Sequence, residues 1–294
     1  MSAHTHPVTI ALVQMQSCAQ PRLNMERATD HIRQAAAQGA QIVCLQELFH
    51  SPYFCQSEDT APFRLAEPIP GPSSEKLSKL AAKLNIVLIA PIFEQRTQGL
   101  YHNSAVIFDA DGAQLGVYRK MHIPDDPGYY EKYYFTPGDR GYLSFTTRYA
   151  KIGVLICWDQ WFPEAARLTT LGGAQIIFYP SAIGWHDDEP DDGAQAQYNA
   201  WETVQRSHAI TNGVFVAVVN RVGQEGEVRF WGASFVANPY GQVIARAPHD
   251  EATTLLATCD LSAIDNMRQN WPFLRDRRID TYAPLTARFR DDTC

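Results

Sequence analysis

The feature that most constrains the fold is a series of short apolar runs, rich in Val and Ile, without polar alternation. Strands of this kind are buried on both faces, so a sheet built from them needs a covering layer on each side. The runs are Thr9–Gln14, Gln41–Glu47, Val87–Phe93, Ser104–Phe108, Ile152–Cys157, Gln175–Tyr179, Val214–Asn220, Gly232–Ala237 and Leu255–Asp260. The sequence therefore predicts an α/β fold with buried sheets.

Amphipathic helical patterns fill the intervals between these runs. They cover residues 24–39, 73–85, 162–173 and 194–213. A serine is expected to cap the helix at 73–85, and Pro163 falls in the first turn of the helix at 162–173. Helices in these positions supply the layers that the sheets require.

Two turn sequences predict antiparallel pairing within the α/β alternation. "DADG" lies between Phe108 and Ala113, and "NPYG" lies between Val236 and Gln242. Two mixed sheets enclosed by helices accommodate both hairpins. No Pro/Gly/Ser-rich linker or repeat divides the chain, so we expect one domain over 1–294. The tail at about 268–294 has no clear period and is expected to form an arm that contacts a second subunit.

Composition narrows the functional classes. The net charge is −7 without a basic stripe, which argues against a nucleic-acid partner. No apolar run approaches the ~20 residues that span a bilayer, so we expect no membrane partner. The 6 cysteines include no CxxC pair, which is typical of free thiols in a reducing compartment. We therefore expect a cytoplasmic protein.

A cysteine stands where a buried strand is followed by a helical pattern, in "KIGVLICWDQWFPEAARL" at residues 151–168. The dipole and free N–H groups of a following helix would favour the thiolate of Cys157. That context makes Cys157 a candidate nucleophile. The alternative is a small buried core residue, which is what most free cysteines are.

Two charged residues occupy comparable places after strands. Glu47 ends the apolar run "QIVCLQE", where a carboxylate is a candidate general base. Lys120 ends "GAQLGVYRK", where an ammonium beside a thiolate would stabilise it and then an oxyanion. The alternatives are a structural carboxylate that holds loop amides and a solvated surface lysine.

The motifs "LQELF", "YRKMHIP" and "GVLICWDQWFPEAARL" together resemble the nitrilase superfamily of carbon–nitrogen hydrolases, over nearly the whole chain. The resemblance implies a four-layer α-β-β-α sandwich, no cofactor, and homo-oligomers from a dimer upward. It also implies that Glu47 is the general base, Lys120 the oxyanion-stabilising cation and Cys157 the nucleophile. Glu131, in "YYEKYYFTPG", matches the second glutamate of the family's site.

The flanking segments "QELFHSPYFCQ", "HIPDDPGYYEKYYFTPGD" and "NWPFLRDRRIDTY" resemble the branch of that superfamily that acts on N-carbamoylputrescine. That resemblance implies hydrolysis to putrescine, carbon dioxide and ammonia through a carbamoyl thioester. A substrate with a terminal ammonium needs a carboxylate or aromatic face away from the thiol. The candidate substrate-binding residues are Asp125 or Glu189 for the ammonium, Tyr53, Phe54 or Trp185 for the alkyl chain, and Trp158 for the oxyanion hole. Alternatively, the acidic runs are solvated surface loops.

Three other functions stay open at this point. An N-carbamoyl substrate that carries a carboxylate would need a bidentate arginine, for which Arg206, Arg221 and Arg229 are candidates. A non-catalytic interaction module would have lost the cysteine or the base, and this chain retains both. A nitrile hydrolase has no supporting feature.

A metal hydrolase is a further alternative. His4 with His6, or His186 with Asp187 and Asp188, supply ligand types but no third ligand at recognisable spacing. We therefore expect no metal.

Overall fold

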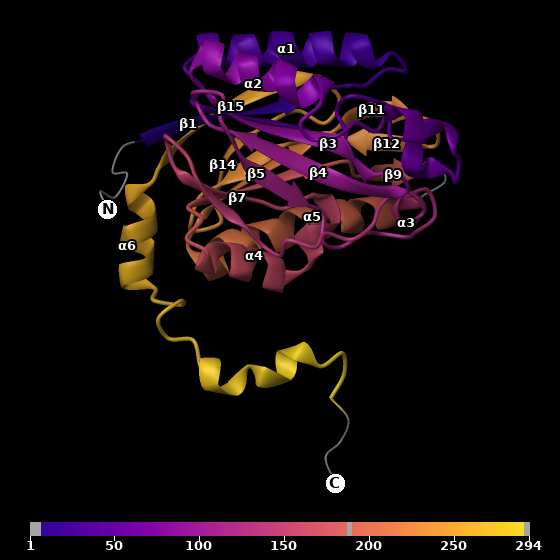
Figure 1. Cartoon of the computed structure of the whole chain (residues 1–294). Helices are drawn as coiled ribbons and strands as arrows, with labels where there is room; N and C mark the ends of the chain where they lie inside the picture. Colours follow the sequence, from indigo (N-terminus) through magenta and orange to yellow (C-terminus); the bar gives the residue numbers. More distant parts are fainter. Residues whose placement is uncertain (1–6, 187–189, 291–294) are drawn as a thin grey trace.

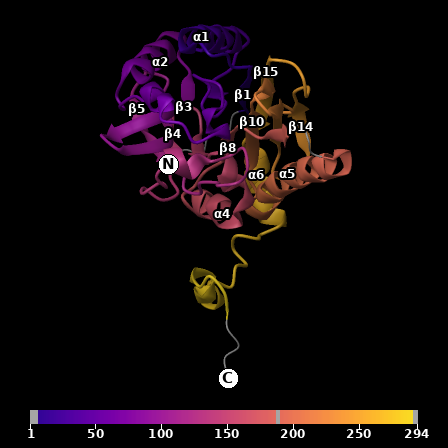
Figure 2. The ribbon, with the colours of Figure 1, turned by 90° about the vertical axis from the view of Figure 1, so that its right-hand side faces the viewer.

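Two β-sheets and two layers of helices form a four-layer α-β-β-α sandwich, as predicted. The computed structural model describes residues 7–186 and 190–290. Helices α1 (Pro21–Ala37) and α2 (Pro72–Leu84) cover one sheet, and α4 (Pro163–Leu171) and α5 (Asp191–Asn212) cover the other (Figure 1). Figure 2 shows the same order of layers from the side.

The first sheet has six strands in the order β15-β1-β2-β3-β4-β5. The strands are β1 (Pro7–Gln14), β2 (Ile42–Leu45), β3 (Val87–Thr97), β4 (Leu100–Phe108), β5 (Gln114–Arg119) and β15 (Thr253–Asp260). Strands β1, β2 and β3 are parallel, whereas β15, β4 and β5 join antiparallel. The "DADG" turn joins β4 to β5, so the first predicted hairpin is confirmed.

The second sheet also has six strands, in the order β14-β13-β10-β8-β7-β6. The strands are β6 (Ser144–Thr146), β7 (Lys151–Val154), β8 (Ile176–Ser181), β10 (Phe215–Asn220), β13 (Phe235–Ala237) and β14 (Val243–Arg246). Strands β7, β8 and β10 are parallel, and the "NPYG" turn joins the antiparallel pair β13–β14, which confirms the second hairpin.

A small third sheet was not predicted. It contains β9 (Gly184–His186), β11 (Val222–Glu225) and β12 (Val228–Trp231), in the order β11-β12-β9. These strands are three or four residues long and lack a continuous apolar run, so no periodic pattern marks them in the sequence.

Strand β1 explains why the predicted strands lack polar alternation. Ile10 and Leu12 point into the core between the two sheets, and Ala11 and Val13 point into the core beneath α1 and α2. Each face of the strand is buried, because successive side chains of a strand point to opposite faces. The same burial holds for the central strands of both sheets.

The predicted serine cap of α2 is wrong. Gly71 is the N-cap, Pro72 begins the helix, and the Gly71 N–H donates to Ser74 Oγ at 2.7 Å. Ser74 therefore lies inside the first turn of α2, where its hydroxyl forms hydrogen bonds with the backbone of Gly71. Pro163 begins α4, as expected.

The chain from α6 (Ser262–Asn270) onward leaves the sandwich as a separate segment (Figures 1 and 2). This C-terminal segment, residues 271–290, contains only short 3₁₀ turns and exposes large apolar side chains, with Ile279 71% and Phe289 78% exposed. Within the described ranges, no helix combines the length and the apolar character that crossing a membrane requires.

Candidate active site

Four buried side chains meet beyond the ends of strands from both sheets. Glu47 follows β2, Lys120 follows β5, Cys157 follows β7, and Glu131 begins the short helix α3 (Glu131–Tyr134). The four residues are far apart in the chain. Because the two sheets face each other, the ends of their strands meet, and the four predicted catalytic residues lie together there.

Lys120 is held between two carboxylates. Its Nζ donates to Glu47 Oε1 at 2.8 Å and to both oxygens of Glu131, at 2.9 and 2.7 Å. Burial opposes the ammonium charge, but the carboxylates outweigh burial and raise the pKa of Lys120 well above its ordinary value. Lys120 therefore stays charged, and a desolvated cation is available beside the thiol.

Glu131 lies on the other side of the lysine. Burial raises the pKa of Glu131 to about 7, although the Lys120 charge opposes that shift. The Tyr53 hydroxyl donates to Glu131 Oε1 at 2.8 Å, and the Tyr53 N–H donates to Glu225 Oε2 at 2.6 Å. The Tyr53 hydroxyl and the Lys120 ammonium both donate to Glu131, so Glu131 holds the ammonium in place.

Glu47 has one occupied oxygen and one free oxygen. Its Oε1 accepts from Lys120 and from Asn103 Nδ2, at 2.8 and 2.7 Å. Its Oε2 is buried and has no hydrogen-bond partner among the described residues. A buried polar atom left unpaired is costly, and such atoms are frequent where a reaction needs them. Oε2 is therefore the oxygen of Glu47 that is open to accept a proton.

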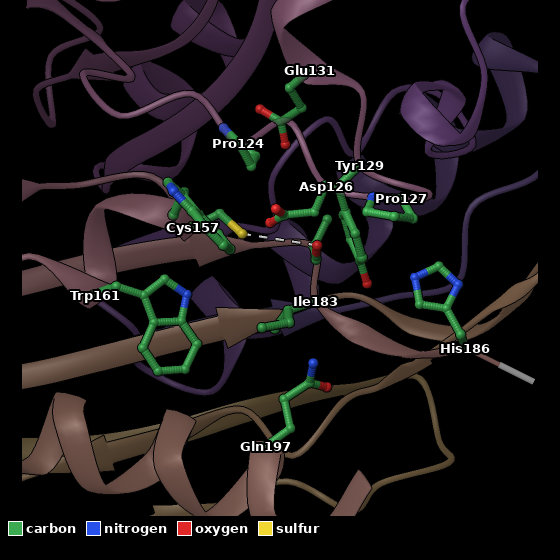
Figure 3. Close-up of a pocket in the computed structure, with 12 residues that line it drawn as sticks. Pro124, Asp126, Pro127, Tyr129, Glu131, Cys157, Trp161, Ile183, His186 and Gln197 are labelled. Carbon is green, nitrogen blue, oxygen red and sulfur yellow. Dashed lines mark hydrogen bonds between the residues drawn. The ribbon is translucent and has the colours of Figure 1, made fainter. Parts of the chain in front are cut away.

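Cys157 lies in a tight turn rather than at the start of a regular helix. Its φ is +42°, and a five-residue 3₁₀ helix, Cys157–Trp161, separates it from α4. Burial, with the charge of Glu47 adding to it, raises the pKa of the Cys157 thiol well above its ordinary value, and Lys120 only partly offsets this. This shift favours the protonated thiol over the helix-stabilised thiolate expected from the sequence, and Cys157 Sγ contacts Ala182 O at 3.8 Å (Figure 3).

A cavity of about 490 Å³ opens in front of the thiol. Figure 3 shows Cys157 and Glu131 toward one end, Gln197 reaching in from α5, and His186 on the opposite side from Cys157. The lining residues are Pro124, Asp126, Pro127, Tyr129, Glu131, Cys157, Trp158, Trp161, Ala182, Ile183, His186 and Gln197. Among the residues that the structure describes, no lysine or arginine belongs to this lining.

The predicted substrate-binding residues divide between the cavity and its surroundings. Trp158 lines the cavity, and Tyr53 lies behind Glu131 as its hydrogen-bond donor. Phe54 does not line the cavity, and its ring stacks on the ring of Phe93 with centroids 5.2 Å apart.

Two more predicted contacts are corrected by the structure. Trp185 packs on Trp231 at 5.2 Å, and its Nε1 donates to Ala194 O, so its indole is outside the cavity lining. Asp125 and Asp126 are both exposed, but only Asp126 lines the cavity, at the point where the loop folds back through a bridge between Asp126 and Tyr129. Glu189 lies outside the described residues.

The three arginine candidates are all engaged elsewhere. Arg221 is buried and donates to the backbone carbonyls of Ser51, Glu47 and Leu48, at 2.8 to 3.0 Å, and to Glu225. Arg206 binds Gly241 O and Glu202, and Arg229 lies over the Trp185 ring. None of the three lines the cavity, so none is placed to bind a substrate carboxylate there.

Sequence reasoning missed Asn103, Asp126, Trp161 and Gln197. Asn103 had a signal, since an amide in strand β4, just before its apolar run, needs a partner if it is buried. Trp161 Nε1 and Gln197 Oε1 are buried without a partner among the described residues and line the cavity. Nothing local in the sequence separates these side chains from ordinary helix and turn residues.

The metal alternatives have little support. His4, His6, Asp187 and Asp188 lie outside the described residues. His186 lines the cavity and packs edge-on against Tyr129. In the described part of the chain, no three His, Cys, Asp or Glu residues are grouped so that they could hold a metal ion.

The comparisons with known proteins agree with this geometry. The family model of carbon–nitrogen hydrolases matches residues 9–269. The chain is 44% identical to the N-carbamoylputrescine amidase of Solanum lycopersicum, with 97% of each chain covered. It is 40% identical to a citrullinase of Francisella tularensis, covering 96% of this chain and 99% of that one. A crystal structure of a carbon–nitrogen hydrolase from Helicobacter pylori superimposes with a TM-score of 0.94 at 45% identity, covering 97% and 100%.

Proposed function

Since this chain belongs to the carbon–nitrogen hydrolase family, we propose that it hydrolyses N-carbamoylputrescine to putrescine, carbon dioxide and ammonia. The observation that carries the proposal is the cavity itself. Its described lining contains the thiol of Cys157 and the carboxylates of Asp126 and Glu131, and it contains no lysine or arginine. A ureido substrate that carries an ammonium matches a described lining with two carboxylates and no lysine or arginine. The similarity to plant N-carbamoylputrescine amidases supports the same substrate.

In the first half-reaction, the Cys157 sulfur attacks the ureido carbon while its proton passes to Glu47 Oε2. A base is needed because the buried thiol is protonated at rest. The carbonyl oxygen becomes an oxyanion, which the Lys120 ammonium stabilises. The bond to the terminal nitrogen then breaks, Glu47 returns the proton to that nitrogen, and ammonia leaves a carbamoyl thioester on Cys157.

In the second half-reaction, Glu47 takes a proton from a water that attacks the thioester carbon. The carbon–sulfur bond breaks, and the proton on Glu47 returns to the Cys157 sulfur. The released carbamate decomposes to carbon dioxide and putrescine. Lys120 gives up no proton in this scheme, because Glu47 carries each proton that is transferred.

The mechanism predicts distinct losses in two variants. Cys157→Ala should abolish ammonia release, by at least about a thousandfold in kcat, because no covalent intermediate can form. Glu47→Gln should lower kcat by about 10²–10⁴-fold, because the amide cannot accept the thiol proton. Ammonia release from purified protein measures both. Full activity in Cys157→Ala, or unchanged release in Glu47→Gln, contradicts the scheme.

The role of Asp126 in binding the substrate ammonium is tested by a pair of neighbouring aspartates. Asp126→Asn should raise KM for N-carbamoylputrescine about threefold to tenfold with kcat nearly unchanged, since one partly exposed ion pair is lost. Asp125→Asn is the matched control, because this adjacent carboxylate is exposed and outside the cavity lining. Glu189→Gln tests the remaining acidic candidate in the same assay. If neither Asp126→Asn nor Glu189→Gln changes KM, the ionic contact is removed from the proposal.

The second candidate function is hydrolysis of an N-carbamoyl compound that bears a carboxylate. The similarity to a citrullinase favours keeping it, because citrulline combines a ureido group with a carboxylate. Parallel assays with N-carbamoylputrescine, N-carbamoyl-β-alanine and citrulline decide between them. Preference for the first supports the proposed substrate, and preference for either of the others overturns it while retaining the chemistry.

We also propose that a second copy of the chain covers the C-terminal segment. Residues 271–290 leave the sandwich and face α4 and α5 across a groove, and Ile279, Leu285 and Phe289 are each more than half exposed. Large apolar side chains gathered on a short segment without its own core are typical of a protein interface. A symmetric dimer would bury both copies of the segment.

A further inference from the structure

Outside the reacting groups, one buried carboxylate accepts hydrogen bonds from two distant segments. Asp159 is fully buried and does not line the cavity. Its Oδ2 accepts from the Ile156 N–H at 3.0 Å and from the Tyr118 hydroxyl at 2.6 Å. Its Oδ1 accepts from the His122 N–H at 3.0 Å and faces His122 Nδ1 at 2.7 Å.

The positions of these donors give Asp159 its importance. Ile156 directly precedes Cys157, whereas Tyr118 and His122 lie two residues before and two residues after Lys120. A single carboxylate therefore joins the turn that carries the thiol to both sides of the residue that carries the ammonium. The His122 ring also stacks on Phe162 at 3.7 Å and 5°, which adds a second contact between the same two segments.

We infer that Asp159 is a positioning residue that sets the distance between the Cys157 sulfur and the Lys120 ammonium. The inference depends on the proposed function only for the identity of the reaction that these two groups carry out. The Tyr118 contact is also stable: burial and then the Asp159 charge raise the pKa of Tyr118, so its phenol remains a donor. Since a carboxylate oxygen accepts, His122 Nδ1 donates to Asp159 Oδ1.

The Asp159→Asn variant is isosteric and removes this arrangement selectively. The amide has one oxygen, so its NH₂ group must face either Ile156 N–H or His122 N–H. Neither backbone donor can become an acceptor, so one of the two segments loses its bond. A misplacement of about 1 Å between reacting groups costs on the order of 100-fold in rate.

The matched control lies at the start of β7, the strand that Cys157 follows. Thr147 is buried in the turn before β7, where its hydroxyl accepts from Tyr149 N and Ala150 N and donates to Ala150 O. Thr147→Val is also isosteric and also removes buried hydrogen bonds, at the end of β7 away from Cys157. Both variants should unfold at a lower temperature than the wild type.

Steady-state kinetics separate positioning from stability. We expect Asp159→Asn to lower kcat about 10–100-fold with KM within about threefold, and Thr147→Val to leave both values within about twofold. Tyr118→Phe removes one donor and keeps both backbone bonds, so it should lower kcat by less, and it serves if Asp159→Asn does not fold. A kcat within twofold of wild type in the folded Asp159→Asn variant, or an equal loss in Thr147→Val, overturns the inference.

A substrate-free measurement keeps this test independent of the proposed reaction. The Lys120 charge favours the Cys157 thiolate, so separating the two should slow alkylation of the thiol by iodoacetamide at pH 8 by at least about threefold. In a Lys120→Met background, Asp159→Asn should cause no further slowing, because the coupled partner is already gone. Equal slowing in both backgrounds, or none in either, contradicts the inference. If the wild type releases no ammonia from any ureido substrate, the proposed function fails and alkylation still decides the role of Asp159.

Discussion

Lys120 and Cys157 show at the scale of single residues that burial alone does not decide charge. Both side chains are buried, and burial disfavours the charged form of each. Lys120 contacts two carboxylates, which reverse the effect of burial on its pKa. Cys157 has one cation and two carboxylates nearby, so its pKa stays high. The site therefore holds the charged ammonium of Lys120 near the neutral thiol of Cys157.

Glu131 gives a pH-dependent prediction at the same scale. Its pKa is about 7 in the folded protein, above the ordinary glutamate value of 4.5. Between these values the folded protein keeps a proton that the unfolded chain has lost, so this group's contribution to stability falls as pH rises from about 4.5 to 7. Glu131→Gln lacks that dependence. The free energy of unfolding of Glu131→Gln minus that of the wild type should therefore increase from about pH 4.5 to about pH 7 and level off above pH 7.

Urea unfolding at pH 5, 6, 7 and 8 measures the difference, with Glu75→Gln as the control for a carboxylate on the outside of α2. A difference between Glu131→Gln and wild type that does not change with pH would show that Glu131 titrates normally.

At the scale of elements, the contact between β7 and α4 holds the turn that carries Cys157. Gly153 lies in β7 directly beneath Thr169 of α4, and a Cβ added to Gly153 would lie 2.1 Å from Thr169 Cγ2. Only a glycine allows the helix to approach the strand this closely. The strand and the helix on either side of the turn are thus packed without spare volume.

Gly153→Ala should therefore destabilise the protein by about 1–3 kcal/mol through overpacking. Thermal or urea unfolding measures the loss. The double variant Gly153→Ala/Thr169→Ser removes the obstructing methyl and should recover most of it, while Thr169→Ser alone is the control. A double variant no more stable than Gly153→Ala would show that this contact is not the cause.

At the scale of the whole molecule, the sandwich and the C-terminal segment differ in how they bury apolar surface. The sandwich has cores between its sheets and beneath α1 and α2. The segment instead meets the helical layer across a groove of about 470 Å³, lined by residues of α4 and α5 and by Arg277, Tyr282 and Leu285. Its apolar side chains remain available for a second copy.

The assembly proposal predicts that the full chain sediments as a dimer or a larger oligomer. Deleting residues 275–294 should shift it toward the monomer, because the exposed apolar side chains of the segment are lost. Leu285→Ser should weaken association in the same direction, and Arg288→Ser is a control at an exposed polar position nearby. A full chain that sediments as a monomer at micromolar concentration contradicts the proposal.

The sequence by itself determined the layers and most of the strands, because burial on both faces of a strand and amphipathic helices are local, periodic patterns. It also singled out Glu47, Lys120 and Cys157 at the ends of strands, and Glu131 through the family resemblance. The short strands β9, β11 and β12 left no such pattern.

Only the tertiary structure decided how those groups behave. The raised pKa of Cys157 comes from burial and then from the charge of Glu47, which follows β2, and the cavity takes Asp126 rather than Asp125 where one loop folds back. Arg221 is committed to backbone carbonyls that lie at least 170 residues away in the chain. A pKa, a cavity wall and a hydrogen-bond partner each depend on atoms that meet only after folding, so no local pattern encodes them.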